Sequence, residues 1–162
     1  MIKTFKGAQL YSLRKKPAQD ELMGQAAVAW TWSLNCVHDA PEWVLKEMRY
    51  TQLSQRRLKM ASGKRMDGRP TEKPLMTIGL AFRPDQRPDK AQMIKAAEAF
   101  LDHMGWQDHQ VLIIAPEGSE RSRMHLVINK VHPETGMTLG EARCRNLSLH
   151  WDPQQVMEEA GL

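Results

Sequence analysis

The middle of the chain carries two apolar runs that predict a β-hairpin. The runs, Val111–Ala115 and Met124–Val131, are separated by a short polar segment with a proline, a glycine and two arginines. Along the second run, apolar side chains at even positions alternate with His125, Val127 and Asn129 at odd positions. Because successive side chains of a strand point to opposite faces, one face can be buried while the other presents an imidazole and an amide.

A third strand is predicted over Ala26–Leu34. Its alternation places Val28, Trp30 and Trp32 on one side, which is typical of a half-buried strand. We expect the two tryptophans to belong to the core. The alternative is that they stack on nucleic-acid bases.

A fourth strand is predicted over Lys73–Phe82. Both of its sides are largely apolar, so we expect it to lie at the centre of the sheet. Gly79 should face the strand that carries His125, where the missing side chain leaves room for a ligand or a backbone.

Three segments have helical patterns. The first has Pro41 in its first turn and spans about Glu42–Met60. The second begins at Asp89, whose carboxylate suits a helix N-terminus, and ends at Gly105. The third is short and covers Pro153–Ala160. A basic loop, rich in glycine and proline, follows the first helix.

The predicted order is β-α-β-α-β-β-α, preceded by an N-terminal helix or strand. A sheet with helices on one face and the hairpin at its centre indicates an α+β architecture. The chain has 162 residues, enough for one domain with its own core, so we expect residues 1–162 to form a single domain.

Composition indicates an ordinary globular chain, with 41% hydrophobic and 26% charged residues. No apolar run reaches the roughly 18 residues of a transmembrane helix, and no signal-peptide core is visible. Cys36 and Cys144 lack a metal-binding spacing and are expected to be reduced thiols. We therefore expect a cytoplasmic protein.

Positive charge is concentrated in one stretch of the chain. The net charge of +4 suits an acidic partner without identifying one. The stretch contains eight basic residues and two acidic ones; the basic residues are Arg49, Arg56, Arg57, Lys59, Lys64, Arg65, Arg69 and Lys73. It is either a solvated helix face that runs into a loop or a surface that contacts phosphates.

The segment MHLVINKVHPETG, residues 124–136, resembles the third motif of the relaxases, which nick plasmid DNA at a transfer origin. That motif reads His-hydrophobic-His, three hydrophobic residues, then Asn-Arg-Val-His-Pro-x-Thr-Gly. Upstream, KPLMTIGLAF and RPDKAQMIKAAEAFLDHMGWQDHQ are similar to the strand, helix and His-Gln turn that precede it. GAQLYSLRKK and VAWTWSLNCVHDAPEWVLKEMRYT resemble the family's N-terminal tyrosine region and the strand and helix after it. The resemblance covers most of the chain.

The resemblance implies a mostly antiparallel five-stranded sheet flanked by helices, in the HUH nickase fold. It implies single-stranded DNA as a partner, and other transfer or mobile-element proteins as further partners. Many relaxases continue into further domains, so the resemblance is compatible both with a single-domain protein and with the N-terminal part of a longer protein. The family's nucleophilic tyrosine carries over to Tyr11, with a packing role as the alternative. A phenol, with a pKa of about 10, needs a cation or a base to help it react.

The family's metal ligands are only partly present. Relaxases chelate a divalent metal, here Mg²⁺ or Mn²⁺, with three histidines: two flank a hydrophobic residue on the second hairpin strand and one is on the first. By the resemblance, His125 holds the last position, whereas Arg123 and Pro116 stand at the other two. Glu117 is a candidate replacement ligand, because carboxylates suit these ions. Further candidates are Glu120, His109 and His132.

Two arginines near His125 favour a phosphate site over a complete metal centre. Guanidinium groups repel cations and bind phosphate. His125 and Tyr11 are the candidate catalytic residues; the candidate DNA contacts are Arg121, Arg123, Asn129, Arg56, Arg57, Lys64 and Arg65. The alternatives are structural: a hydrogen-bonded strand histidine at position 125, and an Asn129 amide that ties down the turn before Pro133.

Two functions follow from these residues. The first is a relaxase-type DNA strand transferase, active through Tyr11 with a weakened or non-standard metal site. The second is a catalytically degenerate relative that binds DNA or a protein partner without cutting. We expect binding of single-stranded DNA at a transfer origin, with nicking impaired.

Overall fold

The computed structural model describes Phe5, Glu158 and residues 27–118 and 122–140. The elements, in chain order, are β1 (Val28–Leu34), α2 (Pro41–Leu53), α3 (Gln55–Ala61), β2 (Leu75–Ala81), α4 (Lys90–Met104), β3 (Val111–Pro116) and β4 (Arg123–Asn129). The predicted order is thereby confirmed for these residues. The predicted N-terminal element and the helix at residues 153–160 fall outside the described residues, apart from Phe5 and Glu158. None of the described helices is both long and apolar enough to cross a bilayer.

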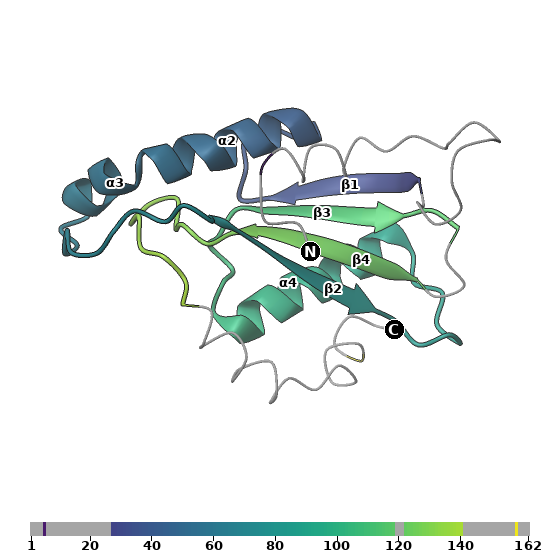
Figure 1. Cartoon of the computed structure of the whole chain (residues 1–162). Helices are drawn as coiled ribbons and strands as arrows, with labels where there is room; N and C mark the ends of the chain where they lie inside the picture. Colours follow the sequence, from purple (N-terminus) through teal and green to yellow (C-terminus); the bar gives the residue numbers. More distant parts are fainter. Residues whose placement is uncertain (1–4, 6–26, 119–121, 141–157, 159–162) are drawn as a thin grey trace.

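The strands form one antiparallel sheet in the order β1-β3-β4-β2 (Figure 1). The predicted hairpin, β3–β4, lies at its centre, with Ile114 opposite His125. Within the described sheet β2 pairs with β4 alone and lies at an edge, not at the centre as expected. The described residues contain four strands, so the fifth strand stays a prediction.

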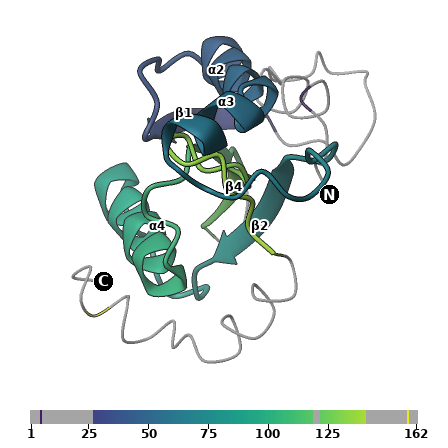
Figure 2. The ribbon, with the colours of Figure 1, turned by 90° about the vertical axis from the view of Figure 1, so that its left-hand side faces the viewer.

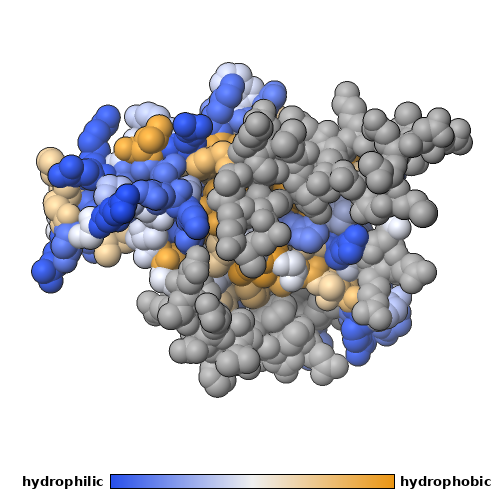
Figure 3. All heavy atoms as spheres, in the orientation of Figure 1, coloured by the Kyte–Doolittle hydropathy of each residue, from blue (hydrophilic) through white to orange (hydrophobic). Residues whose placement is uncertain are grey.

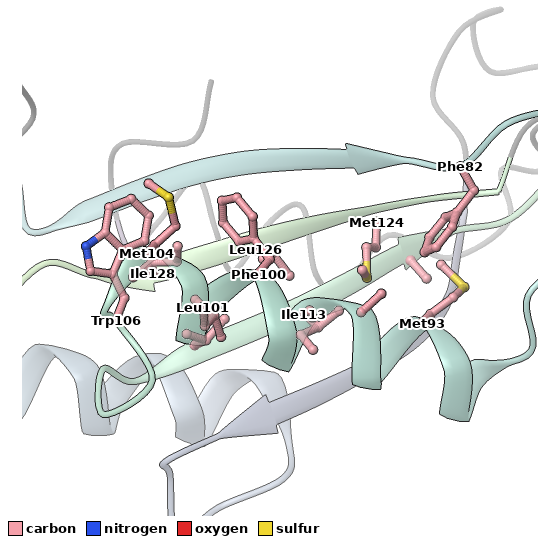
Figure 4. Packing of buried hydrophobic residues seen from close by; sticks show 14 residues of the cluster. Phe82, Met93, Phe100, Leu101, Met104, Trp106, Ile113, Met124, Leu126 and Ile128 are labelled. Carbon is pink, nitrogen blue, oxygen red and sulfur yellow. The ribbon is translucent and has the colours of Figure 1, made fainter. Parts of the chain in front are cut away.

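Helices cover both faces of the sheet, whereas the sequence led us to expect one face (Figure 2). The reason is β3, whose residues Val111–Ala115 are all buried, so both faces need a covering layer. Helix α4 packs on the face formed by even-numbered β4 residues such as Leu126 (Figure 4). Helix α2 packs through Val44 and Met48 on the face that carries Val127.

The helix boundaries follow the predicted signals. Helix α2 begins with Pro41 in its first turn. Helix α4 has a capping box, in which the Asp89 side chain accepts from the Gln92 backbone, and it ends at Gly105 with φ 71°. Only Ser54 separates α2 from α3, and the Ser54 N–H still donates to the Tyr50 carbonyl at 2.9 Å. The single helix predicted to about residue 60 is therefore nearly continuous.

Strand β1 contains an irregularity that the alternation did not reveal. The register shifts between Val28, opposite Pro116, and Trp30, opposite Ala115. Val28 consequently packs on the α2 side and Trp30 on the α4 side, so the prediction that they share a face is wrong. Trp30 packs against the core as expected, but Trp32 is 42% exposed. Lys90 Nζ lies 5.0 Å from the Trp32 ring centre.

Candidate phosphate-binding site

His125 lies on the α2 side of β4 between neighbours of very different size. In the sheet it is opposite Ile114 on β3 and opposite Gly79 on β2. Ile114 is fully buried, whereas a Cβ atom at Gly79 would lie 3.7 Å from His125 Nδ1. The expectation that Gly79 faces the motif strand is confirmed. Because Gly79 has no side chain, the space beside Nδ1 of His125 is not filled from β2 at this position.

The surroundings of His125 favour the neutral form of its imidazole. Burial, followed by the positive charge of Arg123, lowers the pKa of His125 below its ordinary value. A neutral imidazole carries one N–H donor and one nitrogen acceptor. Arg123, two residues earlier on the same face of β4, is exposed and supplies the positive charge. The two side chains therefore combine one permanent cation with one neutral imidazole.

The two positions at which the resemblance places the missing histidines lie beside His125. Pro116 ends β3 and Arg123 begins β4, each two residues beyond the Ile114–His125 pair. Neither a proline ring nor a guanidinium supplies an atom that ligates a divalent cation. A metal site of the family's three-histidine kind therefore does not fit the side chains at these three positions.

Glu117, the candidate replacement ligand, is exposed just after β3, and its backbone N–H donates to the Ala27 carbonyl. Among the described residues, no three His, Cys, Asp or Glu side chains gather as they would around a metal ion. A metal role for Glu117 and His125 stays a prediction. Glu120, like Arg121 and Tyr11, lies outside the described residues.

Asn129 was expected to contact DNA, but it is fully buried. Its side-chain Nδ2 donates to the Met48 carbonyl at 3.1 Å and to Gln110 Oε1 at 3.0 Å. Its Oδ1 accepts from the Val131 N–H at 3.2 Å. All of these bonds are internal, so the amide joins β4 to α2 and holds the chain that follows β4. These bonds support the structural alternative for this residue.

His109 and His132, two further candidate ligands, are engaged elsewhere. Nδ1 of buried His109 donates to the Asn129 carbonyl at 2.8 Å, and burial lowers its pKa. Nδ1 of His132 accepts from the Glu134 and Thr135 N–H groups at 3.1 and 3.2 Å. The two rings meet edge to face at 5.1 Å. They support the turn after β4 and stand apart from His125.

The basic stretch lies at the other end of the molecule. Arg56 and Arg57 are exposed on α3, and Lys64 and Arg65 are exposed on the loop after it. In Figure 1 this end is opposite the start of β4, and Figure 3 shows hydrophilic residues gathered over it. Arg65 forms an ion pair with Asp67 at 3.3 Å. The structure thus separates the candidate DNA contacts into two groups.

Comparison with known proteins identifies the family. The family described as "Relaxase: MobA/VirD2-like, nuclease domain" matches residues 13–155, which leaves Tyr11 just outside the match. Protein MobA of Acidithiobacillus ferrooxidans is 36% identical over 56 residues, 35% of this chain and 14% of that protein. The aligned region is thus a small part of that relative. No solved structure matches the chain. Because the family match spans most of its length, the chain belongs to the MobA/VirD2-like relaxases, as their nuclease domain.

Proposed function

We propose that this domain binds single-stranded DNA at a transfer origin through a phosphate site built from Arg123 and His125, and that its tyrosine-mediated nicking is impaired. The supporting observation is the position of Arg123. It begins the strand that carries His125, and its charge lowers the pKa of that histidine. The position therefore attracts a phosphate and repels a divalent cation.

The geometry around His125 suits a phosphodiester. Gly79 has no side chain that could lie over the Nδ1 side of the ring, and Arg123 is exposed on the same face of β4. A guanidinium can bind two phosphate oxygens at once, and a neutral imidazole can donate to a third. Arg121, three residues before Met124 in sequence, is expected to add a second guanidinium.

Impaired nicking follows from the charge that these residues can supply. Attack by Tyr11 needs stabilisation of charge on the phosphoryl oxygens and help with loss of the phenol proton. Arg123 provides one positive charge but no ligand position at which a divalent cation could act. We therefore expect Tyr11 chemistry to be slow, with DNA binding retained.

A nicking assay tests this function. Labelled single-stranded DNA that carries a transfer origin is incubated with the protein and Mg²⁺ or Mn²⁺, and protein–DNA adducts are resolved by denaturing electrophoresis. We expect strong binding and a weak adduct that Tyr11→Phe abolishes. No binding at low salt, together with no effect of Arg123→Gln, would exclude the proposal.

A second test of the proposed function restores the missing histidine ligands of the metal site. Arg123→His restores the His-x-His pattern on β4, and Pro116→His adds the third position. The double variant should bind Mn²⁺, measured by paramagnetic relaxation of water protons, and should form more adduct than the wild type. Arg123→Gln is the matched control, because it removes the same charge without adding an imidazole. Equal adduct yields from the double variant and the control would contradict the account of impairment.

The second candidate function, DNA or protein binding without cutting, is favoured by the same two residues, Pro116 and Arg123. The adduct assay separates the two. An adduct lost in Tyr11→Phe establishes strand transfer, whereas binding with no adduct at any metal concentration establishes the non-catalytic function.

A further inference from the structure

A pocket lies between α3 and the loop that follows it. In Figure 1, α3 lies at the opposite end of the molecule from the start of β4. Its volume is about 210 Å³. The residues that line it come from the helix and from the loop; they are Gln55, Arg56, Lys59, Met66, Gly68 and Pro70. Figure 2 views the molecule from this end.

One of the residues that line the pocket, Gln55, is buried and held in place by hydrogen bonds. Gln55 is only 3% exposed, and both ends of its amide are bonded within the protein. Nε2 donates to Thr138 Oγ1 at 2.7 Å, and Oε1 accepts from the Thr71 N–H at 3.2 Å. These bonds join α3 to the segments before β2 and after β4. The position of α3 at the pocket is therefore fixed by hydrogen bonds to other parts of the fold.

Two cations line the pocket. Arg56 is exposed, and Lys59, one helical turn later, donates from Nζ to the Asp67 carbonyl at 3.4 Å. The Asp67 carboxylate is paired with Arg65. Among the residues the structure describes, no acidic side chain lines this pocket. The pocket is therefore electropositive, and part of its wall, Met66 and Pro70, is apolar.

We infer that this pocket holds one phosphodiester of the bound DNA strand, with the adjoining sugar or base against Met66 and Pro70. Arg56 and Lys59 contact the phosphate oxygens, since a guanidinium and an ammonium both form charge-assisted hydrogen bonds with them. The inference rests on the proposed function and adds to it a second anchor, separate from the His125 site. Lys59 is a residue that sequence reasoning did not single out from the basic stretch.

The matched pair Arg56→Ala and Arg57→Ala tests the pocket. Both variants lose one exposed arginine of α3, but only Arg56 lines the pocket. Affinity for a fluorescein-labelled oligodeoxythymidylate is measured by anisotropy at several salt concentrations. Arg56→Ala should weaken binding about tenfold, as loss of a charge-assisted contact does, and should reduce the salt slope by about 0.7. Arg57→Ala should weaken it less than about threefold, through long-range attraction alone.

Methyl NMR gives a readout that does not depend on affinity. With ¹³C-methyl-labelled methionine, the Met66 signal should shift when the oligonucleotide is added. Met60 is the internal control, because it lies on α3, is 70% exposed and does not line the pocket. Inorganic phosphate and thymidine monophosphate are added separately; a Met66 shift by either, at concentrations that displace the oligonucleotide, identifies a phosphate or mononucleotide site instead.

The outcomes separate the inference from the proposed function. If the wild type binds DNA but Arg56→Ala and Arg57→Ala weaken it equally and Met66 does not shift, the pocket is excluded while the proposed function stands. If the wild type does not bind the oligonucleotide at low salt, the proposed function itself fails. A selective loss at Arg56 with a selective Met66 shift establishes the pocket as a DNA anchor.

Discussion

Gly79 and His125 lie directly opposite each other across the β2–β4 ladder, and a Cβ atom at Gly79 would stand 3.7 Å from His125 Nδ1. Gly79 is not among the described residues with positive φ, so its backbone accepts a side chain without strain. The size of the residue at position 79 therefore controls access to one ring nitrogen of His125.

Two substitutions at Gly79 should separate an effect on DNA access to His125 from an effect on the stability of the fold. Gly79→Ala makes an ordinary van der Waals contact with the ring and should raise the free energy of unfolding by up to about 1 kcal/mol, as expected within a strand. Gly79→Val places a methyl group over Nδ1 and should weaken binding of single-stranded DNA severalfold. Urea denaturation and anisotropy measure the two effects. Equal affinities of the wild type and Gly79→Val would show that this side of the imidazole does not contact DNA.

The pKa of His125 should respond to Arg123. Burial and the Arg123 charge both lower it, so removal of the charge in Arg123→Gln should raise the pKa of His125 toward its ordinary value. A titration of the imidazole ¹⁵N signals by NMR measures the change. His109, whose pKa is lowered by burial and not by Arg123, serves as the control, and its pKa should stay the same. An unchanged His125 would mean that Arg123 points away from it.

Acidification should destabilise the fold. The pKa values of His109 and His125 are both lowered in the folded state. The unfolded chain therefore binds more protons as the pH falls through the ordinary histidine range, about 6.5, and the free energy of unfolding decreases. Urea denaturation between about pH 7.5 and 5.5 should show this decrease. His125→Gln should make the dependence shallower; an unaltered slope would exclude a contribution from this residue.

Loss of the Asn129 amide should cost stability and leave DNA contacts intact. Asn129→Ala leaves the Met48 carbonyl, Gln110 Oε1 and the Val131 N–H without this partner in the interior. The expected loss in free energy of unfolding is about 2–4 kcal/mol. Folded variant protein should bind the oligonucleotide as the wild type does. Weaker DNA binding by Asn129→Ala with an unchanged free energy of unfolding would show that Asn129 contacts DNA.

Gly136 and Gly63 have nearly the same φ, 67° and 68°, but differ in how closely other atoms surround them. A Cβ atom at Gly136 would lie 2.5 Å from the Gln55 carbonyl oxygen, whereas one at Gly63 would meet nothing within 4 Å. Gly63→Ala should cost about 1 kcal/mol from the torsion alone. Gly136→Ala should cost about 2 kcal/mol more, because α3 must shift. Similar melting temperatures for the two variants would contradict this packing.

Local chemistry made the hairpin and the helix ends predictable. The alternation around His125 gave β4 and its faces, Pro41 marked the start of α2, and Asp89 with Gly105 bounded α4. The continuous apolar run Val111–Ala115 was also the signal for helices on both faces, since every one of its residues is buried. The sequence therefore contains the signal for two covering layers.

Other features depend on which segments meet, and a one-dimensional pattern does not report this. Apolar residues on both sides of β2 indicate two covered faces, but they do not say which strands lie beside it. Asn129 and His125 occupy equivalent positions in the alternation, yet Asn129 is fully buried and bonded to the Met48 carbonyl of α2, whereas His125 is only partly buried. The pocket at Arg56 likewise exists only because the loop after α3 folds back over Lys59.

The contact between Gly136 and α3 also changes what the relaxase signature means in this chain. The last residue of that signature touches the helix that bears Arg56, and its histidine, His132, caps the turn in between. This half of the signature therefore encodes architecture. A relaxase whose metal ligands were replaced would still need His-Pro-x-Thr-Gly to hold this turn against α3. Similarity in this segment therefore reports common ancestry and fold, and it does not report nuclease activity.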